Sequence, residues 1–209
     1  MTPPLDAALV RELRRIVGEG GVITTPDRLL SYESDGLTAY RATPTAVVLP
    51  ADTEEAGRVL AALHRVRVPV VPRGAGTGLS GGALATAGGV VVGTARMNRI
   101  LEIDPANRTA RVQTGTVNAR LSQAARPHGL YYAPDPSSQS ACTLGGNVAE
   151  NSGGPHCLKY GVTSRYVTGL TLVLPDGERA RLGGPARSVG GLDLVGVVVG
   201  SEGCFGLVT

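Results

Sequence analysis

Residues 72–82 read PRGAGTGLSGG and come directly after a short apolar strand pattern. Glycine dominates this run, and backbone without side chains turns sharply and approaches a bound group closely. Successive small residues leave main-chain N–H groups directed into one concavity, which suits phosphate oxygens. The run lacks the Gly-Lys-Ser/Thr of a triphosphate-binding loop, and no helix pattern begins within it, so a Rossmann dinucleotide site has little support. The alternative is a plain glycine-rich turn between two strands.

The sequence around this loop predicts a small parallel β-α-β unit. Apolar strands are expected at 46–49, 68–71 and 89–93, and Asp52 with Glu55 three residues later is typical of a helix start. Strand, helix and strand at this spacing favour parallel strands joined by a right-handed crossover. The expected helix presents one apolar face, formed by Ala56, Val59, Leu60, Leu63 and Val66.

Outside this unit the pattern changes. An amphipathic helix is expected from Pro4 to Val17, and residues 21–44 look irregular. After the loop, a strand pair is expected within 98–114, and then a helix that Thr116 caps and that runs to Ala125. A hairpin is expected over 167–182, and strands at 194–199 and 207–209.

These patterns predict an α+β fold of two subdomains with a groove between them, a small parallel β-α-β unit plus a larger, mainly antiparallel sheet flanked by helices. We divide the chain into an N-terminal helix and lead-in (1–44), a first subdomain (45–97) and a second subdomain (98–209).

Composition narrows the classes of function. The chain has 209 residues, 30 of them glycine, and a formal net charge of +3. Arginines are scattered without aromatic interleaving, so we expect no nucleic-acid partner and favour a small anionic ligand. The start of the sequence lacks a signal-peptide pattern and no apolar run is long enough for a transmembrane helix. Three widely spaced cysteines argue against a disulfide framework. We therefore expect a cytoplasmic protein, with peripheral membrane attachment through a partner left open.

Two further stretches contain residues suited to binding. Residues 134–161 are long, small and glycine-rich, with almost no periodicity, and include CTLGGNVAENSGG at 142–154. A loop of this length inside a compact domain is usually functional, although a disordered surface loop is the alternative. Residues 199–209 read VGSEGCFGLVT, for which a strand-end turn is the plain alternative.

Together these three stretches, in this order, resemble the FAD-binding domain of the vanillyl-alcohol oxidase / p-cresol methylhydroxylase flavoproteins, and within it the hydroxyacid branch of glycolate oxidase and D-lactate dehydrogenase. The resemblance runs from about Leu49 to Thr209. It implies FAD as cofactor and oxidation of a 2-hydroxy acid to the 2-oxo acid, with hydride transfer to flavin N5. It also implies a small hydroxyacid substrate, with an electron-acceptor subunit or a separate cap-domain subunit as partner.

The resemblance also implies which residues contact FAD. The loop Arg73, Gly74, Ala75, Gly76, Thr77, Gly78, Leu79 and Ser80 would hold the diphosphate through main-chain amides. A second group would lie near the flavin and its linker: Pro134, Asp135 and Ser137. A third group would pack along the diphosphate, the ribityl chain and the ring: Thr143, Gly145, Gly146, Ala149, Asn151 and Gly153. The adenosine side would be contacted by Glu202, Gly206 and Val208.

Two departures from the family pattern affect the expected chemistry. Members that tether FAD through this loop carry a histidine where this chain has Thr77, so the resemblance implies noncovalent FAD. The family's cap domain, which supplies the metal ligands and the catalytic base, is absent from the sequence. The catalytic residues are therefore unknown, and no metal site is expected. The alternative function is a truncated or split-gene FAD-binding module without independent activity; the flavin-dependent reductase of cell-wall synthesis fits less well.

Few side chains are candidates for acid–base catalysis. His64 is expected on the solvated side of a helix and His128 at a helix end, both in structural roles. His156, within the long loop, is the only histidine expected near the flavin, although a catalytic role for it has little support. Lys159 and Arg165 are candidates for attracting an anionic substrate, with solvated surface roles as the alternative.

Overall fold

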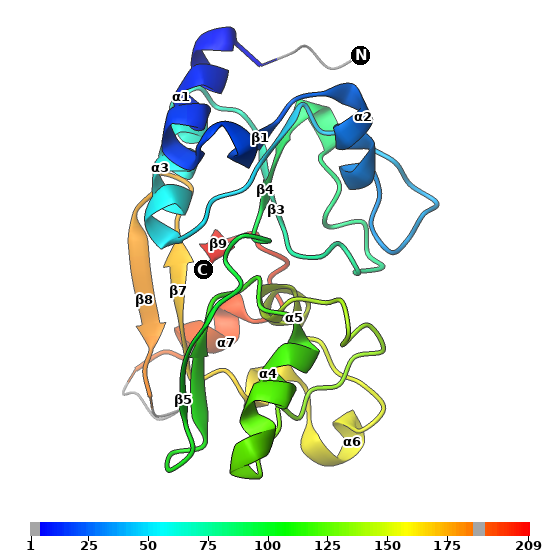
Figure 1. Ribbon diagram of the computed structural model, residues 1–209, viewed down its shortest axis with the longest axis vertical. Helices are drawn as coiled ribbons and strands as arrows, with labels where there is room; N and C mark the ends of the chain where they lie inside the picture. Colours follow the sequence, from blue (N-terminus) through cyan, green and yellow to red (C-terminus); the bar gives the residue numbers. More distant parts are fainter. Residues whose placement is uncertain (1–4, 186–190) are drawn as a thin grey trace.

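The computed structural model describes residues 5–185 and 191–209. Figure 1 shows the helices and strands up to β4 (Val90–Gly93) at one end of the long axis. The other end holds β5 (Ile100–Asp104), α4 (Asn118–Ala125) and α6 (Cys157–Tyr160), with α5 (Leu144–Glu150) and β9 (Leu207–Val208) between the two ends. Within the described residues, none of the helices combines the length and the apolar character needed to cross a bilayer.

The first sheet has four strands in the order β1-β2-β4-β3. Strands β2 (Ala46–Val48) and β3 (Val70–Arg73) each pair in parallel with β4 (Val90–Gly93), and β1 (Val22–Ile23) pairs antiparallel with β2. The helix α3 (Thr53–Arg65) connects β2 to β3. The predicted parallel β-α-β unit is therefore confirmed, with β3 beginning two residues later than expected.

The start of α3 has the predicted cap. The Asp52 side chain accepts a hydrogen bond from the Glu55 N–H at 2.9 Å, and the Glu55 carboxylate accepts one from the Ala51 N–H at 2.8 Å. Four of the five expected residues of the apolar face are buried. Val66 is the exception, because the helix ends at Arg65 and leaves Val66 exposed.

The helix α1 (Ala7–Val17) packs beside α3 in the main hydrophobic core, to which it contributes Leu9, Leu13 and Val17. Asp6 caps the helix; the expected start at Pro4 lies outside the described residues. The irregular pattern expected for 21–44 missed β1 and a short helix, α2 (Pro26–Leu29).

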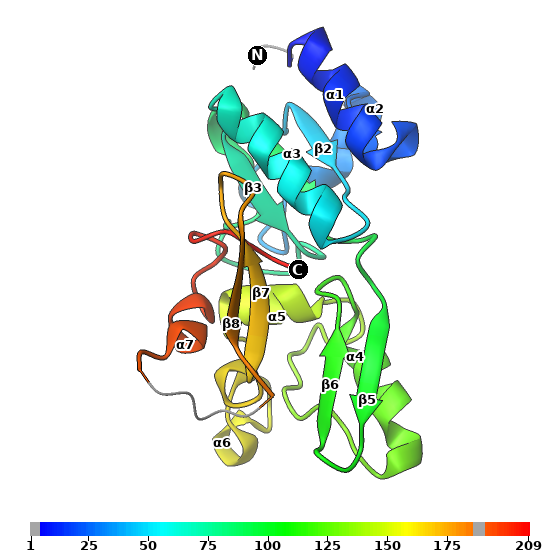
Figure 2. The ribbon, with the colours of Figure 1, turned by 90° about the vertical axis from the view of Figure 1, so that its left-hand side faces the viewer.

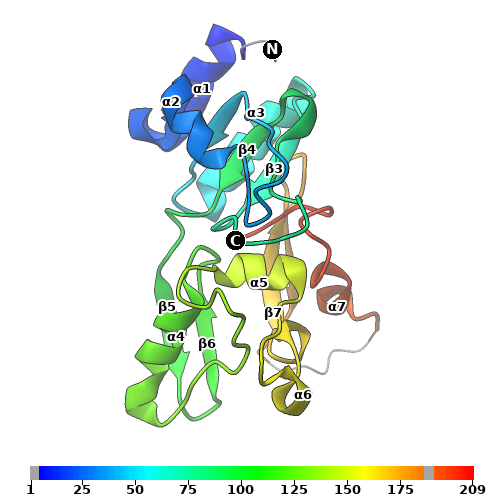
Figure 3. The same ribbon diagram turned by 90° about the vertical axis from the view of Figure 1, so that its right-hand side faces the viewer.

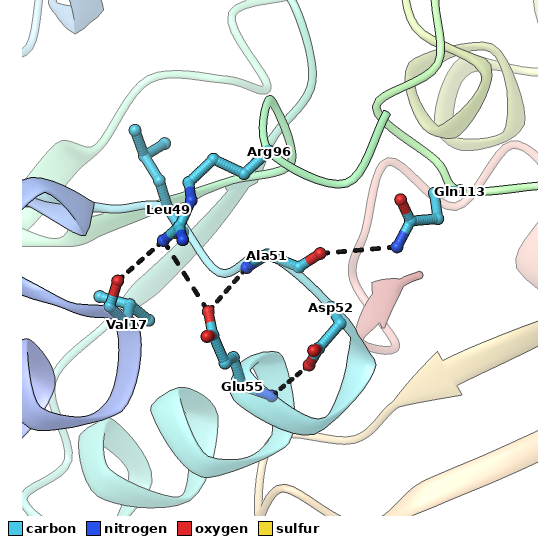
Figure 4. A network of polar contacts seen from close by, with 7 residues as sticks. All are labelled: Val17, Leu49, Ala51, Asp52, Glu55, Arg96 and Gln113. Atoms are coloured by element: carbon cyan, nitrogen blue, oxygen red, sulfur yellow. Dashed lines mark hydrogen bonds and ion pairs between the residues drawn. The ribbon is translucent and has the colours of Figure 1, made fainter. Parts of the chain in front are cut away.

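The polar network in Figure 4 joins four segments near the predicted subdomain boundary. The Arg96 guanidinium donates to the carbonyl oxygens of Val17 and Leu49 at 2.8 and 2.7 Å, and lies 3.8 Å from the Glu55 carboxylate. Gln113 donates to the Ala51 carbonyl oxygen at 3.5 Å. This network connects the ends of α1 and β2 and the start of α3 to Arg96, in the segment that leads into β5, and to Gln113 farther along the chain.

The antiparallel strands form two small sheets instead of one larger sheet. Strands β5 (Ile100–Asp104) and β6 (Thr109–Val112) make a pair, and β7 (Gly169–Val173) lies between β8 (Arg179–Gly183) and β9 (Leu207–Val208). Figure 2 shows the β7–β8 hairpin extending upward to α3, where Val173 joins the main core. The expected strand pair, hairpin and last strand are all present.

Three expectations for the second half were wrong. The expected strand 194–199 is a helix, α7 (Leu194–Val198), because a short apolar run has no periodicity that separates strand from helix. Thr116 does not cap α4 (Asn118–Ala125), since its hydroxyl donates to the Arg99 carbonyl oxygen at 3.3 Å. The stretch 134–161, expected to be aperiodic, contains α5 (Leu144–Glu150) and α6 (Cys157–Tyr160).

Candidate functional site

Figure 3 shows the carboxyl ends of β3 and β4 directed toward α5. The residues at these strand ends and on α5 line a pocket. Ligands of open parallel sheets typically bind outside the carboxyl ends of the strands. The third wall comes from the segment between α7 and the end of β9. The pocket is lined by Pro72, Arg73, Gly74 and Thr94; by Gly145, Gly146 and Ala149; and by Val198, Ser201, Glu202, Gly203, Gly206, Leu207 and Val208.

Glycines allow the walls to approach each other. A Cβ at Gly74 would lie 2.3 Å from Thr143 Oγ1, and one at Gly145 would lie 2.7 Å from Thr114 Cβ. Thr143 caps α5, its hydroxyl accepting from the Gly146 N–H at 3.2 Å. The carboxyl end of β3 is therefore packed against the first turn of α5, and main chain forms much of the surface there.

The buried Arg73 side chain holds the glycine-rich loop from beneath. Its guanidinium donates to the carbonyl oxygens of Ser34 at 2.8 Å, Ala83 at 3.3 Å and Tyr32 at 3.4 Å. Gly76 passes over it, where a Cβ would lie 2.3 Å from an Arg73 nitrogen. Protein oxygens therefore occupy the guanidinium, and the Arg73 side chain supports the loop from within the protein.

Three carboxylates lie close to the same loop. The Asp35 carboxylate accepts from the Gly81 N–H at 2.9 Å, and a Cβ at Gly82 would lie 2.7 Å from a Glu202 carboxylate oxygen. Burial raises the pKa of Glu150, and the charges of Glu202 and Asp35 raise it further. Glu202 also has a left-handed φ of 53°, which costs free energy in a residue with a Cβ.

Replacing Glu150 with glutamine is expected to raise the melting temperature at neutral pH. A carboxyl whose pKa is raised by folding contributes stability to the protein while it is protonated. This contribution is complete at pH values below the ordinary pKa of 4.5, and it is lost as the pH rises through the raised pKa. The gain from Glu150→Gln should therefore shrink as the pH falls toward 4.5, which thermal unfolding at a series of pH values measures. The exposed Glu178→Gln is the control; a pH-independent difference for Glu150→Gln would contradict the repulsion.

The pocket unites part of each predicted binding stretch. Eight of the predicted residues line it: Arg73, Gly74, Gly145, Gly146, Ala149, Glu202, Gly206 and Val208. The loop 75–80 continues from this wall toward Glu150, since a Cβ at Gly78 would lie 3.5 Å from a Glu150 oxygen. Thr143 stands behind Gly74 as the cap of α5.

The remaining predicted residues lie outside this pocket. The Pro134 carbonyl oxygen accepts from the Asn118 side chain at 2.9 Å, and the Asn151 side chain accepts from the Ser164 N–H at 2.9 Å. Gly153 and Ser137 do not line it either. Contact of these residues with the cofactor stays a prediction.

The predicted contact residues did not include six residues of the pocket wall. Pro72, Ser201, Gly203 and Leu207 lie inside the quoted stretches, and Thr94 and Val198 lie outside them. Thr94 had a usable signal, because it directly follows the valine-rich strand β4, and residues at the carboxyl end of such a strand often face a ligand.

The histidines lie away from this pocket. His64 and His128 are exposed, and the His156 ring contacts the Asp135 carboxylate, which lowers the pKa of Asp135. Lys159 lies over the Tyr160 ring, 5.0 Å from its centre. No acid–base role follows from these positions. In the described parts of the chain, no group of three or more His, Cys, Asp or Glu is placed to hold a metal ion.

The site fits an extended dinucleotide in two respects. Glycine main chain at Gly74, Gly145 and Gly146 lines the pocket, so no side chain at these positions separates the backbone from a ligand. The buried hydroxyl of Thr94, another lining residue, has no hydrogen-bond partner among the described residues. The pocket volume of about 50 Å³ holds only part of such a molecule, so the rest would extend along the adjoining surface.

Comparisons with known proteins find relatives of this chain. The glycolate oxidase subunit GlcD of Escherichia coli K12 is 50% identical over 208 residues, which cover 99% of this chain and 42% of that relative. A D-lactate dehydrogenase of Anaerostipes hadrus is 40% identical over 180 residues, covering 85% of this chain and 38% of that relative. The chain therefore spans about two fifths of the length of these relatives.

The structure of p-cresol methylhydroxylase with substrate bound matches 97% of this chain and 41% of its own, with a TM-score of 0.80 and 22% identity, which shows a shared fold. Residues 44–183 match the family model described as FAD binding domain. The matched range includes two of the three glycine-bearing segments that meet at the pocket, and the chain belongs to the FAD-binding domain family, with FAD as its cofactor.

Proposed function

We propose that this chain is the FAD-binding part of an oxidoreductase that oxidises a 2-hydroxy acid of the glycolate or D-lactate type to the 2-oxo acid. The convergence of the segments 72–74, 145–149 and 201–208 on one pocket carries the proposal, because the three segments are far apart in the sequence. The names of the relatives support the substrate class.

The residues of this chain would bind and orient the cofactor. The loop 73–80, held beneath by Arg73, would present main-chain N–H groups to the diphosphate, and Val198, Leu207 and Val208 would pack against the adenosine side. FAD, when bound, supplies the hydride acceptor at N5. The hydroxyacid, an electron-acceptor subunit or a separate cap subunit, and a cytoplasmic location are parts of the same proposal.

A second candidate function is an FAD-binding module without turnover of its own. The observation that favours it is that the described pocket contains no histidine, lysine or cysteine, the groups most suited to taking up a hydroxyl proton near neutral pH. On this proposal the chain would bind flavin and depend on another polypeptide for the acid–base groups.

The visible absorption spectrum of the purified chain, followed by an activity assay, tests both proposals. Flavin absorption bands are expected in either case. Reduction of a dye acceptor by glycolate or D-lactate, with L-lactate as the stereochemical control, would support the enzyme; bound flavin without dye reduction would support the module. A colourless chain that does not bind added FAD would contradict both.

We expect the flavin to be released intact by acid. Thr77 stands in the glycine-rich loop where a histidyl tether would need an imidazole, and a threonine hydroxyl forms no such bond. After acid precipitation, the flavin should appear in the supernatant and co-migrate with FAD in chromatography. Colour retained in the protein pellet would contradict this expectation.

A further inference from the structure

Thr94 carries an unexplained buried hydroxyl. The residue is 4% exposed, and its Oγ1 has no hydrogen-bond partner among the described residues. Burial of a hydroxyl without a partner is unfavourable, and most buried polar groups in folded proteins are satisfied. Thr94 is nevertheless one of the residues that line the pocket, so a ligand bound there is the candidate partner for its hydroxyl.

The position of Thr94 indicates which part of a ligand it meets. Its N–H donates to the Arg73 carbonyl oxygen at 3.0 Å, so Thr94 lies beside the first residue of the glycine-rich loop. Val198 and Leu207, by contrast, form an apolar part of the pocket lining. Thr94 therefore lies next to the main chain that leads into the glycine-rich loop.

We propose that the Thr94 hydroxyl donates a hydrogen bond to a diphosphate oxygen of FAD. The inference rests on the proposed position of FAD in this pocket. A diphosphate offers only acceptors and carries negative charge, which strengthens a hydrogen bond from a neutral hydroxyl. Thr94 is then a cofactor-binding residue that lies outside all three glycine-bearing stretches.

Thr94→Val tests the proposal, since valine keeps the shape and removes the hydroxyl. The affinity for FAD, measured by titration of the flavin-free chain, is expected to fall about 10-fold or more. The melting temperature of the flavin-free chain should stay the same or rise, because the variant removes an uncompensated polar group. Thr94→Ser should restore the affinity.

Thr114→Val is the matched control. Thr114 is 6% exposed and its hydroxyl also lacks a partner, but it does not line the pocket. We expect no change in FAD affinity for this variant. An equal loss for both variants would overturn the proposal, because the effect would then not depend on the pocket.

Ligand fragments locate the bond. Thr94→Val should lower the affinity for ADP by the same factor as the affinity for FAD, and leave the affinity for adenosine unchanged. An equal loss of adenosine affinity would mean that the hydroxyl binds the ribose, and would overturn the proposal. Wild-type chain that binds FAD with the same affinity as Thr94→Val would overturn this inference alone. Wild-type chain that binds no FAD would overturn the proposed function as well.

Discussion

Replacing Arg73 with alanine is expected to lower the free energy of unfolding by about 3 kcal/mol, because the buried guanidinium satisfies three carbonyl oxygens. In a chain of this size that corresponds to a fall of about 6–12 °C in Tm. Asp35 would also lose the positive charge that faces it. FAD affinity should fall as well, since the loop loses the side chain that holds it.

Arg65→Ala is the matched control for charge and side-chain size. Arg65 forms an exposed ion pair with Glu12 at 2.6 Å, and such surface pairs contribute about 0–1 kcal/mol. Arg73→Lys should retain little of the stability that arginine provides, because an ammonium group cannot reach three separate carbonyl oxygens with planar geometry. Equal stabilities of Arg73→Ala and Arg65→Ala, measured by denaturant titration, would contradict the role assigned to Arg73.

Replacing Gly74 with alanine is expected to weaken FAD binding about 100-fold, which is roughly 2.7 kcal/mol. The new methyl group would lie 2.3 Å from Thr143 Oγ1, so either the loop or the cap of α5 must move. Both border the pocket, and a displacement at either removes the close main-chain approach on which the site depends. Flavin titration of the purified variant measures the loss.

Gly20→Ala is the control for Gly74→Ala, because a Cβ at Gly20 would meet nothing within 4 Å and the residue lies outside the pocket. Its FAD affinity should equal that of the wild type. Because Gly74→Ala could also unfold the chain, circular dichroism should accompany the titration. A folded Gly74→Ala chain with wild-type affinity would refute the tight packing between the loop and α5.

Local patterns predicted the first subdomain well. The cap at Asp52 and the apolar face of α3 follow from side-chain spacing alone, and three short valine-rich strands around one helix leave few topologies. The predictions were weaker where local signals conflict. The run Leu194–Val198 is apolar throughout, so its helical state depends on the Asp193 cap and on packing of Val195 and Val198.

For the site, the glycine-bearing segments were recognisable because glycine-rich main chain has few other uses in a packed domain. The pocket residues Thr94 and Val198, which lie outside these segments, were not, because their surroundings come from elements far away in the sequence. The position of the Arg73 side chain beneath its own loop was equally invisible, since it depends on carbonyl oxygens of residues 32–34.

Local sequence was sufficient to predict the strands and the helix around the loop, and the segments rich enough in glycine to approach a cofactor. The fold was needed to show that β3, β4, α5 and residues 198–208 meet at one pocket. It was also needed to show that Thr94 lines this pocket with a hydroxyl that lacks a hydrogen-bond partner among the described residues. The reason is physical: backbone propensity and hydrophobic periodicity act over a few residues, whereas burial and hydrogen-bond satisfaction depend on groups that only folding brings together.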